Sequence, residues 1–305
     1  MIKIFNEHLE KYCKEHIVGV QSHINYDALS SLESKYIKEN IKHILGAKPN
    51  EFQKILNDKT LKKIDKEKLT KAFVGGYPKD KKGGLVGYAK FIKKDDNNYD
   101  AYRLAEKLQV NVCPYCNINS TFTVIEEENK KITRPEFDHF YDKASYPVLS
   151  LSFYNLIPCC HICNSTLKGS IKFSVSTHVN PYSDSFNKHA KFKLKIEDTT
   201  FYHSVDGFKL ELEFDDKKAE NSAEVFKIKE RYNKHKDLIL ELIQKQEMYP
   251  DSYIDELLLN YEGVLFKNRE DLLRFITCGY TDDESINKRP LSKLIKDISK
   301  ELGLT

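Results

Sequence analysis

Two short cysteine motifs constrain this chain more than any other feature of its sequence. Cys113-Pro-Tyr-Cys116 and Cys160-His-Ile-Cys163 are both C-x2-C pairs, and 43 residues lie between them. Two thiolates at this spacing can bind one zinc ion from a tight turn, and two such turns complete a tetrahedral site. The spacing therefore predicts a structural zinc site made by these four cysteines. The long interval predicts that a further structural element is inserted between the two turns.

Other assignments of the cysteines stay open. Buried unpaired thiols are the plain alternative to zinc, and Cys159 and His161 are rival ligands. Cys159 fits a small core residue better, and His161 fits a residue that starts a helix or faces a phosphate. The chain has seven cysteines, five of them in two short stretches, which favours metal binding in a reducing compartment over disulfides. The sequence has no membrane-spanning apolar run and no signal-peptide core, so we expect a cytoplasmic protein.

The hydrophobic pattern predicts an α+β protein in three segments. Residues 1–109 form a helical, lysine-rich region, in which an apolar stripe precedes Pro49 and a further helix is expected at about 97–109. Residues 110–190 hold the cysteine motifs. Residues 191–305 begin with two alternating runs, which predict a strand pair over 191–214, and continue as helices. The stripes lie at Ile37, Ile41, Ile44 and Leu45 in the first segment and at Leu238, Ile239, Leu242 and Ile243 in the last.

Positive charge is concentrated before the cysteine motifs. Residues 1–110 carry 22 basic and 15 acidic side chains, residues 111–190 carry seven of each, and residues 191–305 carry 20 and 24. Within residues 59–94 there are 12 lysines against three acidic residues. Such a cluster can follow a phosphate backbone, and a solvated helix face explains it equally well. The glycine pairs of residues 74–87 predict an ordered loop or a hinge, without the spacing of a phosphate-binding P-loop.

A polar series between and within the cysteine motifs resembles the HNH (ββα-metal) nuclease motif in its cysteine-bearing subclass. The series is Asp138-His139, Asn155, Cys163-Asn164 and Lys168-Gly169. It is most similar to the PtuB-like nucleases of Septu-type bacterial anti-phage systems, and the resemblance covers about residues 110–185. It implies a central ββα-metal core that carries the four-cysteine zinc site and is flanked by helical N- and C-terminal regions.

The resemblance implies a role for each catalytic residue. His139 is the general base, Asp138 and Asn164 bind a catalytic Mg²⁺ or Mn²⁺, and Asn155 holds the loop that carries the base. A neutral imidazole can accept a proton from water near pH 7, and a hard divalent cation neutralises phosphate charge. Taken singly, each residue also has an ordinary explanation as a surface pair or a cap of a turn or helix.

Three cations are candidates for contact with the substrate phosphate. Lys168 lies one helical turn after Asn164 and could reach a phosphate from the same face. Lys143 and Arg134 are weaker candidates, and solvation or ion pairing accounts for either of them. Asp138 and His139 would point to opposite faces of a regular strand. The family places this pair where the first strand ends, so the resemblance implies that a loop follows His139.

These features predict a metal-dependent HNH endonuclease that hydrolyses phosphodiester bonds, in DNA rather than RNA. The resemblance further implies an effector of bacterial anti-phage defence that is controlled by an ABC- or SMC-like ATPase partner (PtuA-like), with the C-terminal helices as a candidate docking surface. Two alternatives remain. One is a zinc-stabilised module that binds nucleic acid or protein without cleaving it, and the other is a stand-alone restriction-type nuclease.

Overall fold

The computed structural model describes residues 2–4, 6–76, 84–127 and 130–305. The chain forms two compact units, which are described separately. The N-terminal unit comprises Ile4–Val110 and Thr121–Asp184, and the C-terminal unit comprises Met1–Lys3, Asn111–Ser120 and Ser185–Thr305. Among the described residues, no helix combines the length and the apolar character that a membrane crossing requires.

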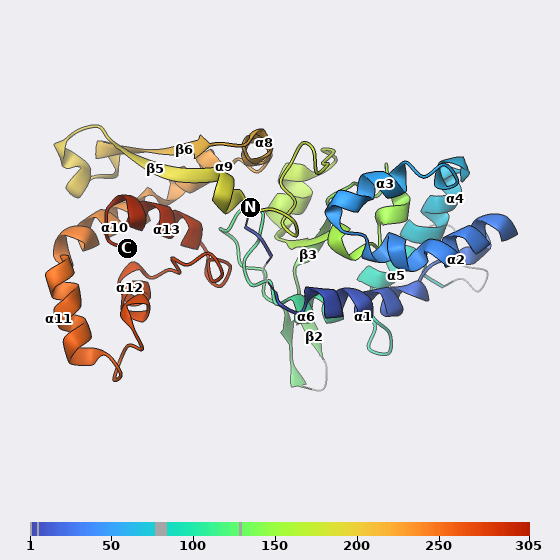
Figure 1. Ribbon diagram of the computed structural model, residues 1–305, viewed down its shortest axis with the longest axis horizontal. Coiled ribbons are helices and arrows are strands. Elements are labelled where there is room, and N and C mark those ends of the chain that lie inside the picture. The colour runs from blue at the N-terminus through green and yellow to red at the C-terminus, as the bar shows by residue number, and fades with distance from the viewer. Residues whose placement is uncertain (1, 5, 77–83, 128–129) are drawn as a thin grey trace. The chain divides into compact units, whose positions relative to one another are not determined.

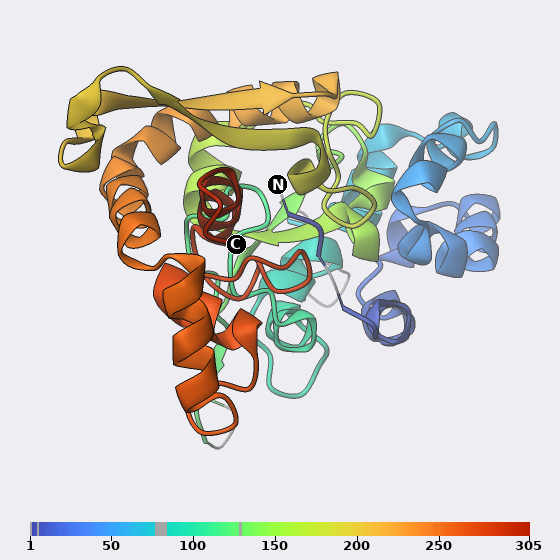
Figure 2. The same cartoon turned by 60° about the vertical axis from the view of Figure 1, so that its left-hand side comes forward.

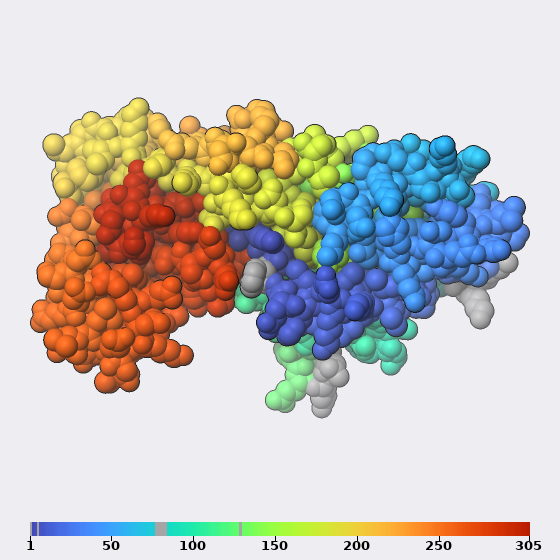
Figure 3. All heavy atoms as spheres, in the orientation of Figure 1, coloured from blue at the N-terminus to red at the C-terminus, as the bar shows by residue number. Residues whose placement is uncertain are grey.

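The N-terminal unit begins with helices that bury their apolar faces. Helices α1 (Leu9–Gln21) and α2 (Ser31–Gly46) contact each other, and Figure 3 shows them as adjoining blue surfaces. The predicted stripe of α2 is confirmed, because Ile37, Ile41, Ile44 and Leu45 are its buried residues. The other α-helices and the first π-helix follow in chain order: α3 (Phe52–Leu56), α4 (Lys66–Leu69), the π-helix η4 (Thr70–Val74), α5 (Gly87–Ile92) and α6 (Ala101–Leu108).

Helix α6 is shorter than the predicted range 97–109. The Asp100 side chain accepts a hydrogen bond from the Arg103 N–H at 3.1 Å and so begins the helix. Gln109 ends it with a left-handed backbone (φ 49°). The helix itself is confirmed, and its cap residues set the bounds.

The predicted glycine loop lies partly outside the described residues, at 77–83. Its two flanks show why glycine is needed there. Gly75 and Gly87 have φ angles of 74° and 58°, a region that favours glycine. A Cβ atom would lie 2.0 Å from the Val86 carbonyl oxygen at Gly75, and 2.4 Å from the Phe73 carbonyl oxygen at Gly87. Both flanks of this loop are therefore closely packed against backbone.

In the described part of the chain, the strands form three two-stranded antiparallel sheets. The N-terminal unit holds β1 (Val124–Ile125) with β2 (Lys131–Thr133), and β3 (Glu136–His139) with β4 (Leu156–Cys159). Between β3 and β4 lie the 3-10 helices η6 (Pro147–Leu149) and η7 (Phe153–Asn155), and the π-helix η8 (Ile162–Lys168) follows β4. The local order is thus strand, loop, strand, helix. Strand β3 ends at His139.

The C-terminal unit is built on a hairpin and helices. Strands β5 (Ala190–Ile196) and β6 (Phe208–Phe214) pair along their whole lengths, which confirms the strand pair predicted over 191–214. Helix α13 (Ser292–Glu301) packs against β5, as Figures 1 and 2 show. The other α-helices are α7 (Phe186–His189), α8 (Lys217–Val225), α9 (Ile228–Tyr232), α10 (Lys236–Met248), α11 (Asp251–Tyr261) and α12 (Arg269–Thr277). Helix α10 buries Ile239, Leu242 and Ile243, as its stripe predicts.

Candidate active site

Each C-x2-C pair lies on a tight turn. The Asn117 N–H donates to the Cys113 carbonyl oxygen at 2.8 Å, and the Asn164 N–H donates to the Cys160 carbonyl oxygen at 3.0 Å. The Ile118 N–H lies 3.5 Å from Cys116 Sγ, a contact that suits a thiolate acceptor. Both turns therefore have the local geometry on which zinc-binding cysteines are usually carried.

The four cysteines form a buried cluster. Their exposed fractions are 9% or less, and their sulfur atoms lie within 4.8 Å of one another. Within the described residues, no other group of three or more histidine, cysteine or acidic side chains meets that distance. The set could bind zinc through four thiolates. Its members are Cys113, Cys116, Cys160 and Cys163.

The two rival ligands lie elsewhere. Cys159 is fully buried at the end of β4, as a core residue would be, and stays outside the cluster. His161 stands at the start of η8 with 70% of its side chain exposed, and its Nδ1 lies 2.7 Å from a Glu136 carboxylate oxygen. His161 is thus a helix-start residue, which is one of the two interpretations that its sequence position allows.

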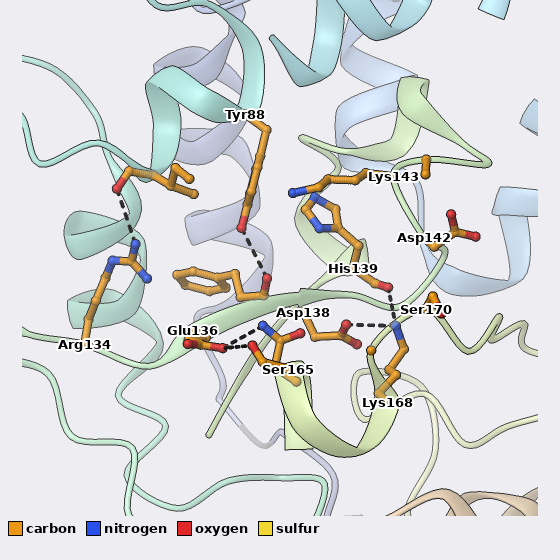
Figure 4. A pocket seen from close by; sticks show the side chains of 15 residues that line it. Tyr88, Arg134, Glu136, Asp138, His139, Asp142, Lys143, Ser165, Lys168 and Ser170 are labelled. Carbon is orange, nitrogen blue, oxygen red and sulfur yellow. Dashed lines mark hydrogen bonds and ion pairs between the residues drawn. The ribbon is translucent and has the colours of Figure 1, made fainter. Parts of the chain in front are cut away.

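A cavity of about 650 Å³ in the N-terminal unit brings most of the predicted active-site residues together. Asp138 and His139 reach it from the end of β3, and Asn164 and Lys168 reach it from η8. Figure 4 shows this arrangement. The lining further includes the two other predicted cations and three residues that the sequence did not single out: Lys143, Arg134, Tyr88, Glu136 and Asp142.

His139 is held as a neutral imidazole. Its Nε2 lies 2.9 Å from the Ser150 carbonyl oxygen, and because a carbonyl only accepts, Nε2 carries the proton and Nδ1 is left as the acceptor. Burial lowers the pKa of His139 to about 3, and the nearby charge of Lys143 contributes. The ring is therefore neutral at pH 7, the form that a general base requires. The Tyr88 ring packs against it with a centroid distance of 4.3 Å.

Asn155 does not line the cavity, and its side chain ties together the loop that follows β3. Its Oδ1 accepts from the Tyr141 N–H at 2.7 Å, and its Nδ2 donates to the carbonyl oxygens of Tyr141 and Leu149, both at 3.0 Å. Asn155 is completely buried. Three hydrogen bonds made by one amide therefore fix both ends of the segment between Tyr141 and Leu149, which follows His139 closely.

Asp138 and Lys168 form a buried ion pair at the cavity. The Lys168 ammonium donates to Asp138 Oδ1 at 2.8 Å and to the His139 carbonyl oxygen at 2.9 Å. Only 2% of the Lys168 side chain and 4% of the Asp138 side chain are exposed. The sequence suggested a lysine that extends toward a phosphate, whereas the structure holds this ammonium between two acceptors of β3.

Glu136 is the residue of the site that the sequence analysis missed. Its carboxylate binds His161, accepts from Asn164 Nδ2 at 2.8 Å and accepts from Ser165 Oγ at 3.1 Å. Burial alone would raise the pKa of Glu136, but these hydrogen bonds outweigh it and lower the pKa. Strand periodicity offered a signal, because residues 136 and 138 share a face of β3. No local signal marks Tyr88, which contacts the site across 49 residues of sequence.

The remaining two cations differ in their surroundings. The Lys143 ammonium lies 4.7 Å from the centroid of the Tyr88 ring, and burial lowers the pKa of Lys143. Arg134 is partly buried between aromatic rings and donates to the Pro135 carbonyl oxygen at 2.7 Å. Both basic side chains belong to the lining of the cavity.

Asp138 and Asn164 fit a hard divalent cation. A carboxylate and an amide oxygen are ligands that Mg²⁺ and Mn²⁺ prefer, and both residues line the cavity. Because the Asn164 amide nitrogen donates to Glu136, the amide oxygen is directed away from Glu136. A cation here would share the Asp138 carboxylate with Lys168, and the ammonium would repel it.

One comparison with known proteins gives a match. Over 81 residues, which are 27% of this chain, the sequence is 33% identical to Septu protein PtuB of Bacillus thuringiensis. The match covers 28% of that relative's length. No protein-family model matches the chain, and no solved structure matches it. The finding supports a distant relationship to a Septu protein over about a quarter of each chain.

Proposed function

We propose that this chain is a metal-dependent HNH endonuclease that hydrolyses phosphodiester bonds in nucleic acid, DNA in preference to RNA. The observation that carries the proposal is the cavity that unites Asp138, His139 and Asn164 around the strand, loop, strand, helix order of β3, β4 and η8. The distant relationship to a Septu protein supports a role in bacterial anti-phage defence.

The residues divide the hydrolysis between them. His139 Nδ1 accepts the proton of the attacking water, and the Ser150 carbonyl holds the ring in the tautomer that makes this possible. Asp138 and Asn164 would hold a divalent cation, which when bound supplies charge stabilisation at the scissile phosphate and the leaving oxygen. Lys143 and Arg134 are the cations that orient the phosphate, because Lys168 is already engaged by β3.

A plasmid-nicking assay tests the proposal. The wild-type protein should convert supercoiled plasmid to open-circular or linear DNA with Mg²⁺ or Mn²⁺, and EDTA should stop it. His139→Ala should lower the rate by about 10²–10⁴-fold, the usual contribution of a general base. His203→Ala, which changes an exposed histidine of the C-terminal unit, should cleave like the wild type. Equal rates for wild type and His139→Ala would refute the assignment.

We propose that the four-cysteine cluster binds one structural zinc ion. Four thiolates hold zinc tightly, and structural zinc contributes directly to folding. Cys113→Ser or Cys163→Ser should therefore lose zinc in elemental analysis and yield much less soluble protein. Cys278→Ser is the matched control, because Cys278 is free, exposed and outside the cluster. Pure, folded wild-type protein without zinc would rule the site out.

One observation favours a second candidate function. The Lys168 ammonium neutralises the Asp138 carboxylate without any metal. The cavity could therefore hold a phosphate in a module that binds nucleic acid and does not cleave it. Such a module would slow the migration of DNA in a gel-shift assay, with or without EDTA. It would not nick DNA with any divalent cation. The nicking assay therefore separates the two functions, and cleavage by the protein alone would also favour a stand-alone enzyme.

The partner belongs to the same proposal. Helices α11 and α12 and the segment between them expose large apolar side chains, among them Leu259 (87%), Val264 (79%) and Phe275 (67%). Clustered exposed apolar residues often mark protein-binding surfaces. We assign this surface to an ATPase of the PtuA type, as the distant Septu relationship suggests. This protein should co-purify with an ATPase encoded by a neighbouring gene, and the co-purification should fail when Leu259 and Phe275 are changed to Asp.

A further inference from the structure

Glu136 occupies a place that the hydrolysis proposed above does not use. It begins β3, two residues before Asp138, and the two residues share a face of the strand and line the same cavity. About a third of its side chain, 37%, is exposed. An acidic residue beside an active site either binds a cation directly or orients a neighbour that does. The contacts of Glu136 decide between these two roles.

All three hydrogen-bond partners of Glu136 come from the start of η8. One carboxylate oxygen lies 2.7 Å from His161 Nδ1, and the other accepts from Asn164 Nδ2 at 2.8 Å and from Ser165 Oγ at 3.1 Å. Figure 4 shows the bond between Glu136 and Ser165 as a dashed line. These three donors take up three of the roughly four acceptor positions of the carboxylate, which leaves little capacity for direct ligation of a cation.

The contact with Asn164 determines which atom of its amide reaches the cavity. An ionised carboxylate only accepts hydrogen bonds, so the amide atom that faces Glu136 is the nitrogen. The amide oxygen is then turned away from Glu136. Without Glu136, the amide could rotate and present its nitrogen, which cannot bind a cation, toward Asp138.

We propose that Glu136 is a positioning residue that selects the amide oxygen of Asn164 as the second ligand for a divalent cation at Asp138. The inference rests on the proposed nuclease function. His161 and Ser165 assist by tying the first turn of η8 to β3 through the same carboxylate. Residues that orient metal ligands typically change metal affinity by about 10- to 100-fold when they are removed.

Two substitutions separate orientation from direct ligation. Glu136→Gln keeps an acceptor oxygen for Asn164 and loses the negative charge. Glu136→Ala loses both. A positioning role predicts that Glu136→Gln binds Mn²⁺ within about threefold of the wild type, whereas Glu136→Ala binds it about 10- to 100-fold more weakly. If Glu136 were itself a ligand, Glu136→Gln would also lose far more than threefold in affinity, because a neutral amide oxygen would replace a charged carboxylate.

The experiment measures Mn²⁺ binding to the full chain by electron paramagnetic resonance of free Mn²⁺, and cleavage as a function of Mn²⁺ concentration. Glu136→Ala should need more Mn²⁺ and recover most of its cleavage rate at saturation. Asn164→Ala should lose affinity to a similar extent, and Glu136→Ala should cost little more in its background, because both changes remove one ligand. Zinc content and the melting temperature report folding, and Glu136→Leu replaces Glu136→Ala if the latter does not fold.

The outcomes distinguish this inference from the proposed function. Wild-type affinity in Glu136→Ala, a loss well beyond threefold in Glu136→Gln, or additive losses with Asn164→Ala would each overturn the positioning role. If Mn²⁺ binding by the wild type and the Glu136 variants follows the prediction but the wild type cleaves no nucleic acid, only the nuclease function is refuted. His139→Ala is the control for that difference, since it should bind Mn²⁺ normally and fail to cleave.

Discussion

Buried lysine–aspartate pairs occur in both units, and Lys168–Asp138 and Lys293–Asp297, one from each unit, make similar bonds in different surroundings. Lys168 donates to Asp138 at 2.8 Å and to the His139 carbonyl oxygen at 2.9 Å. Lys293 on α13 donates to Asp297 at 2.5 Å and also to a backbone carbonyl oxygen at 2.8 Å. All four charged side chains are at most 9% exposed. The chemistry of the two pairs is therefore nearly the same.

The difference lies in what else each carboxylate faces. Asp297 accepts a second hydrogen bond from the Phe192 N–H at 2.8 Å and so links α13 to β5. Asp138 lines the 650 Å³ cavity together with His139 and Asn164. A buried ion pair costs desolvation energy and is weak evidence of stabilisation in itself. Both pairs link two elements, which gives each a structural explanation, but Asp138 also borders the cavity, which invites a functional one.

The largest predicted difference concerns cleavage. Asp138→Asn and Asp297→Asn each remove one negative charge and leave a neutral oxygen beside the lysine. Asp138→Asn should lower the cleavage rate by roughly three orders of magnitude, because a bound cation contributes several kcal/mol to the transition state and each 1.4 kcal/mol is tenfold. Asp297→Asn should leave the rate per folded molecule within twofold. Single-turnover nicking of a labelled DNA measures both.

Metal removal provides the control for this prediction. Brief EDTA treatment should stop wild-type cleavage without unfolding the protein, and added Mg²⁺ or Mn²⁺ should restore it. Oxygen ligands release Mg²⁺ readily, whereas four thiolates retain zinc. Asp138→Asn should resist rescue and keep its zinc. Loss of zinc from this variant, or rescue of the EDTA-treated wild type by zinc alone, would mean that the two metals are assigned to the wrong residues.

The second prediction uses the lysines. Removing one partner of a buried ion pair leaves an uncompensated charge and costs roughly 3–5 kcal/mol. Lys168→Met and Lys293→Met should both lower the free energy of unfolding to that extent in EDTA. With Mg²⁺, the cation can compensate Asp138 in place of the ammonium, so Lys168→Met alone should regain stability. Chemical denaturation with and without Mg²⁺ measures the effect. If Mg²⁺ changes the stability of both variants equally, it does not bind at Asp138 in place of the Lys168 ammonium.

The sequence predicts best the helices and strands that follow from the periodicity of their own apolar residues. The stripe from Ile37 to Leu45 and the strand pair over 191–214 are confirmed, because amphipathic periodicity survives in a single sequence. The bounds of α6 differ from their prediction, since the cap at Asp100 sets its start and the left-handed Gln109 sets its end. The role predicted for His139 remains a prediction, but the cavity unites it with Asp138 and Asn164.

The rest depended on contacts that leave no trace in spacing. Tyr88 reaches His139 from a distant helix, and nothing near residue 88 predicts it. Helical spacing placed Lys168 beside Asn164, yet whether its ammonium meets solvent or a carboxylate depends on how η8 packs against β3. Glu136 was accessible through the two-residue period of strands. The polar series that carries the nuclease resemblance begins at Asp138 and does not include Glu136.

The smallest predicted effect extends the comparison to buried histidines. His139 borders the cavity, whereas His23 is 1% exposed in the core of the same unit, and neither of its ring nitrogens has a hydrogen-bond partner among the described residues. Burial lowers the pKa of His23 to about 4, from an ordinary value of 6.5. The unfolded chain therefore binds a proton that the folded chain resists, and stability is lost as the pH falls from about 6.5 toward 4.

His23→Phe removes this titration and retains an aromatic ring in the core. Between pH 7.5 and pH 5, linkage with these two pKa values costs the wild type about 2 kcal/mol of unfolding free energy at this residue. Between these two pH values, the unfolding free energy of the variant should therefore fall by about 2 kcal/mol less than that of the wild type. Its cleavage rate at pH 7.5 should stay at the wild-type level. Urea denaturation at the two pH values measures the difference. An identical pH dependence in His23→Phe would show that His23 is not neutral in the folded core, whereas altered cleavage would show that it acts on the cavity and is not the purely structural counterpart of His139.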